Sequence, residues 1–329
     1  MKAVLFSVYG GPEVLQFAEI ETPAPGPGEV LVKGHAAALN PVDWHFVRGA
    51  PFPMRMMMGG LRGPKHPRRV GADFAGTIAA IGSGVTGFTV GDPVFGYAES
   101  GGALAEYLTV PAEKVAPKPE RLTFEQAAAV PLAGLTALQV LRDHALVRSG
   151  HHVLIVGAAG GIGSFAVQIA KAFGAEVTGV QSAGVLDLVR SLGAARVIDY
   201  TKDDFTTGDA RYDLVFDNVC NRTFRDVRRV MKPSGTFIPN GGGSPDKGIS
   251  MLGLIRLLAT RPFIKQKIKL FVTKPNRADL QVLADMIQAG TVTPVIDTVY
   301  PLTAAAEALR HLESGHAHGK IVVTIPSRA

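Results

Sequence analysis

Residues 153–163 read Val153-Leu154-Ile155-Val156-Gly157-Ala158-Ala159-Gly160-Gly161-Ile162-Gly163. The four aliphatic residues at the start predict a β-strand, and the glycines at 157, 160 and 163 form a G-x-x-G-x-x-G loop directly after it. The residues that follow predict an amphipathic helix, because apolar side chains recur there with a period of 3.6 residues. These side chains are Ile162, Phe165, Ala166, Ile169, Ala170 and Phe173.

The small residues of this loop favour binding of a dinucleotide. A backbone that turns sharply, approaches a pyrophosphate closely and lets a helix pack on a strand has no room for large side chains. The helix N-terminus also offers free N–H groups and the positive end of its dipole to phosphates. The alternative is a tight strand–helix connection that binds nothing, and the strand–loop–helix context favours dinucleotide binding over it.

Strands alternate with helices from His151 onward, which predicts parallel strands joined by right-handed crossovers and hence a doubly wound α/β sheet. The strands are predicted at 153–156, 176–180, 196–198, 213–217 and 235–239. The first 120 residues instead alternate short β-branched runs with turn signals, which is typical of a β-rich unit. Thr123 is a predicted N-cap ahead of Glu125 and Gln126, and residues 320–325 predict a final strand that returns to the first unit.

Length and composition exclude several classes of protein. A chain of 329 residues favours about two domains, and 47% hydrophobic with 19% charged residues rules against a disordered chain. No segment reaches the roughly 20 apolar residues of a membrane span, and the N-terminal run is too brief for a signal peptide. Cys220 is the single cysteine and cannot form an internal disulfide, so the expected location is the reducing cytoplasm.

The net charge of +6 raises the question of nucleic-acid binding. Basic residues cluster at 62–69, 222–229 and 261–269, but no nucleic-acid motif accompanies them. We interpret the clusters as solvated surface, with some attraction for an anionic cofactor.

The end of the second predicted strand bears on the choice of dinucleotide. NAD sites usually carry an acid about 20 residues after the glycines, where it binds the ribose 2′-OH. Here Val180 runs into Gln181-Ser182-Ala183-Gly184, so no acid repels a 2′-phosphate and Ser182 is able to donate to one. NADPH is therefore the predicted cofactor, although Ala183 and Gly184 supply no positive charge.

Motifs in order along nearly the whole chain resemble those of the zinc-independent quinone oxidoreductase (zeta-crystallin-like) branch of the medium-chain dehydrogenase/reductase superfamily. The motifs are Asn40-Pro41-Val42-Asp43-Trp44, Gly71-Ala72-Asp73-Phe74-Ala75-Gly76, residues 90–96, 102–107 and 131–137, the glycine loop, residues 192–194 and 198–200, and Gly319-Lys320-Ile321-Val322. The resemblance implies a GroES-like catalytic domain, residues 1–122 and 292–329, and a Rossmann-type NADPH-binding domain, residues 123–291. It also implies a cofactor in the interdomain cleft and a homodimer as the expected assembly.

The resemblance implies roles for individual residues. Asn40 and Thr136 would lie near the nicotinamide, and Asn240, Gly241 and Lys320 would line the cleft. Ser182 and Tyr200 would surround the adenosine phosphate. The implied pyrophosphate-binding residues are Gly160, Gly161, Ile162 and Gly163, and Gly157, the first glycine of the loop, is a further predicted cofactor-binding residue. Relatives often carry a basic residue after the second strand, and this chain has Gly184 and Val185 there. Segment 46–66, with Met54, Met56, Met57 and Met58, differs widely among relatives and does not identify a substrate.

Hydride transfer from a nicotinamide needs little acid–base help, so no catalytic triad is expected. Asn40 and Asp43 are the candidate catalytic residues, either orienting the nicotinamide or bonding a quinone oxygen; ordinary turn chemistry is the alternative for both. Trp44 is interpreted as core. The methionines would form a soft wall for apolar acceptors or fill gaps in a core.

Zinc-dependent relatives place a cysteine where this chain has Asn40, and a His-Glu pair where it has Ala72-Asp73. Three ligands of that kind are needed for catalytic zinc, so no metal site is expected. His316 and His318 are interpreted as incidental surface histidines.

The predicted function is NADPH-dependent hydride transfer to a quinone or a similar small apolar carbonyl or enone acceptor. One alternative is a reductase of enoyl or alkenal double bonds, which needs a proton donor such as Tyr97 or Tyr107. A second alternative, from another class, is an NADPH-gated RNA-binding protein.

Overall fold

The computed structural model describes residues 1–241, 253 and 257–326 and divides into two compact units. Unit 1 comprises Met1–Leu135, Lys274–Gly290 and Pro294–Ala329, and unit 2 comprises Thr136–Thr273 and Thr291–Thr293. This grouping places residues 123–135 and 274–290 with unit 1, whereas the sequence assigned both segments to the cofactor domain. The reason is packing: helix α9 (Arg277–Gln288) lies on strand β8 (Val115–Pro117), and Leu283 lies against Gly134.

Unit 2 is built on a six-stranded parallel sheet in the order β11-β10-β9-β12-β13-β14. The strands are β9 (His152–Val156), β10 (Glu176–Gln181), β11 (Arg196–Asp199), β12 (Tyr212–Asp217), β13 (Met231–Pro239) and β14 (Lys267–Ile268). From β9 the chain adds β10 and β11 on one side and then β12, β13 and β14 on the other, so the strand order reverses between β9 and β12. This is the strand order of a Rossmann-type sheet. The predicted doubly wound sheet is therefore confirmed, with β13 beginning at Met231 rather than at Gly235.

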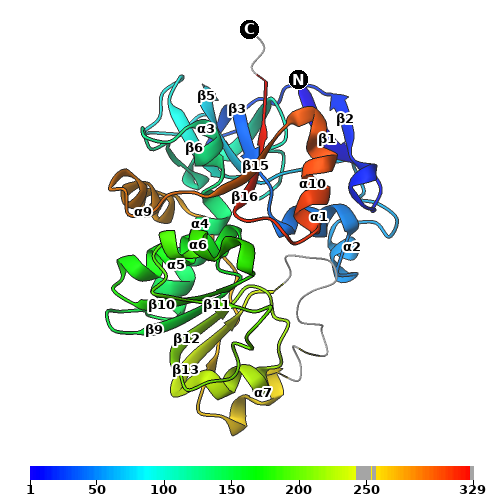
Figure 1. Ribbon diagram of the computed structural model, residues 1–329. Helices are drawn as coiled ribbons and strands as arrows, with labels where there is room; N and C mark the ends of the chain where they lie inside the picture. The colour runs from blue at the N-terminus through cyan, green and yellow to red at the C-terminus, as the bar shows by residue number, and fades with distance from the viewer. Residues whose placement is uncertain (242–252, 254–256, 327–329) are drawn as a thin grey trace. The chain divides into compact units, whose positions relative to one another are not determined.

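Helices cover both faces of this sheet. Helices α5 (Gly161–Ala172) and α6 (Leu186–Ser191) lie over one face and α7 (Phe224–Val227) over the other (Figure 1). The middle of the predicted apolar stripe, Phe165 to Ala170, is buried, whereas Ile162 and Phe173 at its ends are partly exposed. Ser164, Val167 and Gln168, on the other sides of α5, are buried as well. The Gln168 amide accounts for part of this, because it donates to the Thr293 carbonyl (3.0 Å) and accepts from the Thr293 N–H (2.8 Å).

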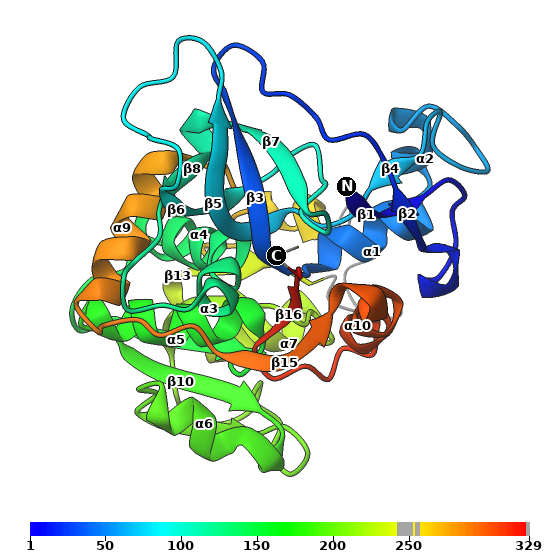
Figure 2. The ribbon, with the colours of Figure 1, turned by 90° about the horizontal axis from the view of Figure 1, so that it is seen from above.

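Unit 1 is β-rich and contains two sheets. The larger has the order β15-β16-β3-β5-β6-β8, with β7 also paired to β3, and the smaller has the order β2-β1-β4. Figure 2 shows β3 and β5 running side by side. Strand β16 pairs antiparallel with β3, which confirms the predicted return of the tail. The bounds are β1 (Lys2–Phe6), β2 (Gln16–Glu19), β3 (Glu29–Ala38), β4 (Arg68–Arg69), β5 (Asp73–Ile81), β6 (Pro93–Tyr97), β7 (Tyr107–Pro111), β15 (Ile296–Pro301) and β16 (Lys320–Thr324).

Two helices of unit 1, α3 (Phe124–Ala128) and α1 (Pro41–Arg48), begin at a capping box. Helix α3 follows Thr123, whose hydroxyl accepts from the Gln126 N–H while the Gln126 side chain accepts from the Thr123 N–H; the predicted cap is confirmed. Helix α1 carries Trp44, which is 3% exposed in the hydrophobic core. The remaining helices are α2 (Pro53–Met57), α4 (Pro131–Gln139), which continues into unit 2, and α10 (Ala305–Glu313). None of the helices described is long and apolar enough to cross a membrane.

Candidate active site and cofactor-binding loop

Four polar side chains from separate parts of the sequence meet inside unit 1. Asn40 follows β3 and precedes α1, Asp43 lies in the first turn of α1, Asp73 begins β5 and Lys320 begins β16. The register explains their meeting, because Ala38 of β3 pairs with Asp73 on one side and with Val322 on the other. All four side chains are buried, with at most 4% of each residue exposed.

Hydrogen bonds join the four side chains into one network. The Asn40 amide nitrogen donates to Asp73 Oδ2 (2.9 Å), and the Asn40 backbone N–H donates to Asp43 Oδ2 (2.7 Å). Lys320 Nζ donates to Asp73 Oδ2 (3.2 Å) and to Asn40 Oδ1. The Leu132 N–H donates to the other Asp73 oxygen (3.0 Å). Burying two carboxyl groups is costly, and the network offsets that cost with a cation and several donors.

Burial dominates the protonation of the acids. It raises the pKa of Asp43 from 3.8 to about 7, assisted by the negative charge of Asp73 and opposed by the Asn40 hydrogen bond. It also raises the pKa of Asp73, against the opposing effect of Lys320. For the half-buried Tyr97, burial and then the charges of Asp73 and Asp43 raise the pKa of the phenol. Tyr97 thus holds its proton firmly, whereas Asp43 titrates near neutrality.

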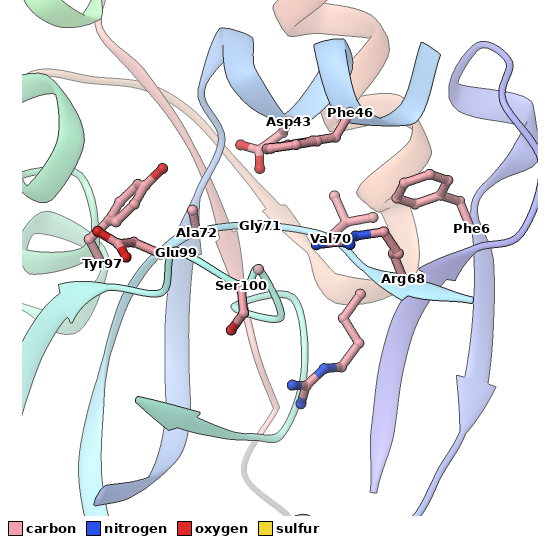
Figure 3. Close-up of a pocket in the computed structure, with 12 residues that line it drawn as sticks. Phe6, Asp43, Phe46, Arg68, Val70, Gly71, Ala72, Tyr97, Glu99 and Ser100 are labelled. Atoms are coloured by element: carbon pink, nitrogen blue, oxygen red, sulfur yellow. The ribbon is translucent and has the colours of Figure 1, made fainter. Parts of the chain in front are cut away.

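Asp43 and Tyr97 face one small pocket, which we call the Asp43 pocket. Figure 3 shows Asp43 and Phe46 projecting from α1, with Tyr97 and Glu99 at the end of β6 and in the turn after it. Its volume is about 20 Å³, which is room for a single water molecule. The lining residues are Phe6, Asp43, Phe46, Arg68, Arg69, Val70, Gly71, Ala72, Tyr97, Glu99, Ser100 and Gly101.

In unit 2 the glycine loop has the geometry that a pyrophosphate requires. Gly157 has φ +75°, a conformation that favours glycine, and Gly160 is the extended N-cap of α5. A Cβ on Gly163 would overlap the carbonyl oxygen of Gly157, so helix and loop touch backbone to backbone there. No side chain caps α5, which leaves its first N–H groups available to an anion.

Other predicted cofactor residues gather at the carboxyl ends of β9, β12 and β13. Asn218, which follows β12, donates to the Val156 carbonyl (3.1 Å) and lies against Gly157. The Asn240 amide donates to Asn218 Oδ1 (2.9 Å), and the Gly241 N–H donates to Cys220 Sγ (3.2 Å). These residues border the point where the strand order reverses, the usual ligand position in such sheets. Asn218 was missed from the sequence, although it directly follows a predicted strand.

Ser182 and Tyr200 follow two neighbouring strands, since Gln181 of β10 pairs with Asp199 of β11. The Tyr200 N–H donates to the Gln181 carbonyl (3.2 Å). Lys202, also missed from the sequence, follows two residues later with its ammonium 3.9 Å from Asp199. Asp199 is an acid at this end of the sheet, and its carboxylate accepts from the Thr201 N–H and hydroxyl.

Comparison with known proteins agrees with this geometry. A model described as an alcohol dehydrogenase GroES-like domain matches residues 26–120, and one described as a zinc-binding dehydrogenase matches residues 192–323. A quinone oxidoreductase of Pseudomonas aeruginosa is 34% identical over 98% of this chain and 99% of its own. The chain belongs to the quinone oxidoreductase branch of the medium-chain dehydrogenase/reductase superfamily.

Two further members of the superfamily bear on activity. A 2-methylene-furan-3-one reductase of Solanum lycopersicum is 35% identical over 98% of this chain and 79% of its own. The solved structure of Escherichia coli quinone oxidoreductase complexed with NADPH superposes with a TM-score of 0.85, at 27% identity, over 98% of this chain and 100% of that one. This chain is an NAD(P)H-dependent oxidoreductase whose Rossmann-type domain binds a nicotinamide cofactor.

The zinc of some members of this superfamily does not fit the residues found here. The side chains of Asn40 and Asp73 are hydrogen-bonded to each other, and the Lys320 ammonium group donates to both. The Asp73 carboxylate is therefore already paired with a positive charge. The Ala72 side chain has no atom that could bind a metal. Within the residues that the structure describes, no three potential metal-ligating side chains converge.

The remaining predicted residues are placed as follows. Thr136 is 3% exposed, and its hydroxyl bonds the Thr273 hydroxyl (2.7 Å) within unit 2. Tyr107 is not among the residues that line the Asp43 pocket. Met56 is 70% exposed and Met58 is buried, so these two methionines do not form a common wall.

Proposed function

We propose that this chain is an NADPH-dependent reductase of quinones and of small conjugated enones. The Asp43 pocket carries the proposal. It is lined by the protonated Tyr97 phenol and by Asp43, whose pKa is about 7, and its side chains do not suit a metal ion. Without a metal to polarise it, the acceptor must already be electrophilic, as quinones and enones are. The quinone oxidoreductases and the furanone reductase among its relatives support the same class of acceptor.

The nicotinamide supplies the hydride when it is bound. The residues of the chain provide orientation and a proton. The Asn40–Asp73–Lys320 network fixes the start of α1 and hence the direction of Asp43, since the Asn40 N–H donates to that carboxyl group. When a quinone oxygen or an enone α-carbon takes up negative charge, protonated Asp43 or Tyr97 would supply the proton, and water would restore it afterwards.

We propose NADPH rather than NADH as the cofactor. Ser182 has no side-chain hydrogen bond within the described residues and is free to donate to a 2′-phosphate. Lys202 adds the positive charge that the turn after β10 lacks. The nearby negative charge of Asp199 partly cancels the attraction of Lys202 for a 2′-phosphate. We expect a preference for NADPH that is real but modest.

Steady-state turnover tests the proposed reaction. With NADPH, 1,4-benzoquinone and but-3-en-2-one should be reduced, whereas primary and secondary alcohols with NADP⁺ should be oxidised far more slowly, because an alcohol must first lose its proton to a base or a metal-bound oxygen. Efficient alcohol oxidation beside negligible reduction of quinone and enone would contradict the proposal.

Replacing Tyr97 by Phe separates the two acceptor classes. An enone must receive its proton on carbon, which water does slowly, whereas a hydroquinone oxygen is protonated readily by solvent. Tyr97→Phe should therefore lower kcat for the enone about 10²-fold and leave the quinone rate almost unchanged. Tyr107→Phe is the matched control. Equal losses for both acceptors would remove Tyr97 from the proton-donor role.

A further inference from the structure

A second hollow adjoins the Asp43 pocket in unit 1, and we call it the Arg69 hollow. The two share Arg68, Arg69 and Ser100 as lining residues. The hollow has a volume of about 260 Å³, close to the lower end of small-molecule sites. Its other lining residues are Met58, Pro64, Lys65, His66 and Pro67.

The charges around the Arg69 hollow are all of one sign. Lys65, Arg68 and Arg69 line it, and no aspartate or glutamate does. Two acids line the neighbouring Asp43 pocket, but both are engaged elsewhere. Glu99 lies 3.1 Å from the ammonium of Lys114, and Asp43 accepts from the Asn40 N–H.

Within the described part of the chain, the guanidinium groups of Arg68 and Arg69 have no hydrogen bond and no ion pair. Arg69 is also half-buried against Gly102, and this burial lowers the pKa of its guanidinium. The basic run at 222–229 differs, because Arg222 and Arg229 each lie within 4 Å of an aspartate and Arg225 and Arg228 are exposed to solvent. A partly desolvated, unpaired arginine is unfavourable unless a ligand supplies the anion.

We propose that the Arg69 hollow binds an anionic group of the acceptor, a carboxylate or a phosphate, while the carbonyl oxygen of the reducible group of the same molecule occupies the water-sized Asp43 pocket. This inference rests on the proposed reductase function and narrows its substrate class to acceptors that carry a negative charge a few bonds from the reducible centre. Arg68 and Lys65 add long-range attraction, and Arg69 makes the direct contact.

A matched acid and ester test the proposal. The substrates are 4-oxopent-2-enoate and its methyl ester, which share the enone and differ in charge. Arg69→Met keeps the aliphatic stem and removes the charge, and it should lower kcat/KM for the acid about tenfold or more, mainly through KM. The same variant should leave the ester within about twofold, and Arg69→Lys should restore part of the loss for the acid.

Arg62→Met is the control, since Arg62 belongs to the same basic run, is exposed and lines neither hollow. It should change neither substrate. Dissociation constants for NADPH should be the same in all variants. Equal losses for acid and ester in Arg69→Met, or weaker NADPH binding without a loss for the acid, would overturn the proposal.

Binding without turnover separates this inference from the reductase function. Titration calorimetry of the NADP⁺-saturated protein with 4-oxopentanoate and with its methyl ester should show acid binding that depends on Arg69. If that dependence appears while neither unsaturated substrate is reduced, the anion site stands and the reductase proposal fails. If the ester is reduced but the acid binds no better in the wild type than in Arg69→Met, the anion site fails alone. Competition by inorganic phosphate but not acetate would assign the group as phosphate, and the reverse as carboxylate.

Discussion

Asp43 connects local structure with the candidate site. Its carboxyl group accepts from the Asn40 N–H and so fixes the first turn of α1, and the same group faces the Asp43 pocket. The sequence offered turn chemistry and a catalytic role as alternatives for this residue. The hydrogen bond confirms the first, and the second stays a prediction; one carboxyl group is able to do both.

The protonation of Asp43 should appear in the pH dependence of stability. Because the pKa of Asp43 is raised from 3.8 to about 7 in the folded protein, the folded chain holds a proton between these values that the unfolded chain has lost. The stabilising contribution is complete below the unfolded pKa and disappears as the pH rises through the folded one. Relative to Asp43→Asn, the wild type should lose on the order of 1–3 kcal/mol of unfolding free energy from about pH 4 to about pH 8. Urea unfolding of both proteins across that range measures it, and parallel curves would contradict it.

Gly163 tests the close contact of helix and loop. In Gly163→Ala the new methyl group would overlap the Gly157 carbonyl, so the loop must shift. We expect a loss of about 1–3 kcal/mol of stability and at least about tenfold weaker NADPH binding. Gly184→Ala is the control, since a Cβ there meets nothing within 4 Å. Thermal unfolding and a fluorescence titration with NADPH measure both effects, and a Gly163→Ala protein that behaves like the control would refute the contact argument.

At the scale of elements, α5 shows what a periodic pattern leaves out. The apolar residues at 3.6-residue spacing correctly indicate the face that packs on the sheet. The pattern does not reveal that the other sides are also enclosed, because Ser164 and Gln168 there are polar residues typical of a solvent-exposed face. The Gln168 amide is buried there with hydrogen bonds to the Ser164 carbonyl of the same helix and to the N–H and carbonyl of Thr293, far along the chain.

The adjacent ends of β10 and β11 should govern cofactor preference. Ser182→Asp places a second acid beside Asp199 and should shift preference toward NADH by repulsion of the 2′-phosphate. Lys202→Met should weaken NADPH binding about two- to fivefold and leave NADH unchanged, since an exposed charge contributes little. Fluorescence titration of both cofactors with wild type and variants is the measurement. Tighter binding of NADH than of NADPH by the wild type would overturn the proposed preference.

At the scale of the whole molecule, the family contains zinc-dependent enzymes, and this chain should work without the metal. The site that would hold catalytic zinc contains an amide, a methyl group and a carboxylate already bonded to Lys320. Purified protein should contain well under one zinc per chain by elemental analysis, and chelation should leave NADPH-dependent turnover intact. Activity that disappears with chelator and returns with added zinc would prove this expectation wrong.

The sequence by itself determined the features that depend on neighbouring residues. The glycine loop, the strand–helix alternation and the Thr123 cap follow from backbone sterics and short-range hydrogen bonds, which residues a few positions apart decide. The family resemblance added the two-domain plan and the expectation that Asn40 lies near the nicotinamide.

Only the tertiary structure decided which distant side chains meet. Lys320 lies 280 residues from Asn40 and 247 from Asp73 along the chain, and β-strand register alone brings the three together. Likewise, residues 62–69 are a basic run in the sequence, and only the fold half-buries Arg69 against Gly102 without an acid partner among the described residues. Periodicity and composition record what a residue is, whereas pKa, pairing and burial depend on what the folded chain packs against it.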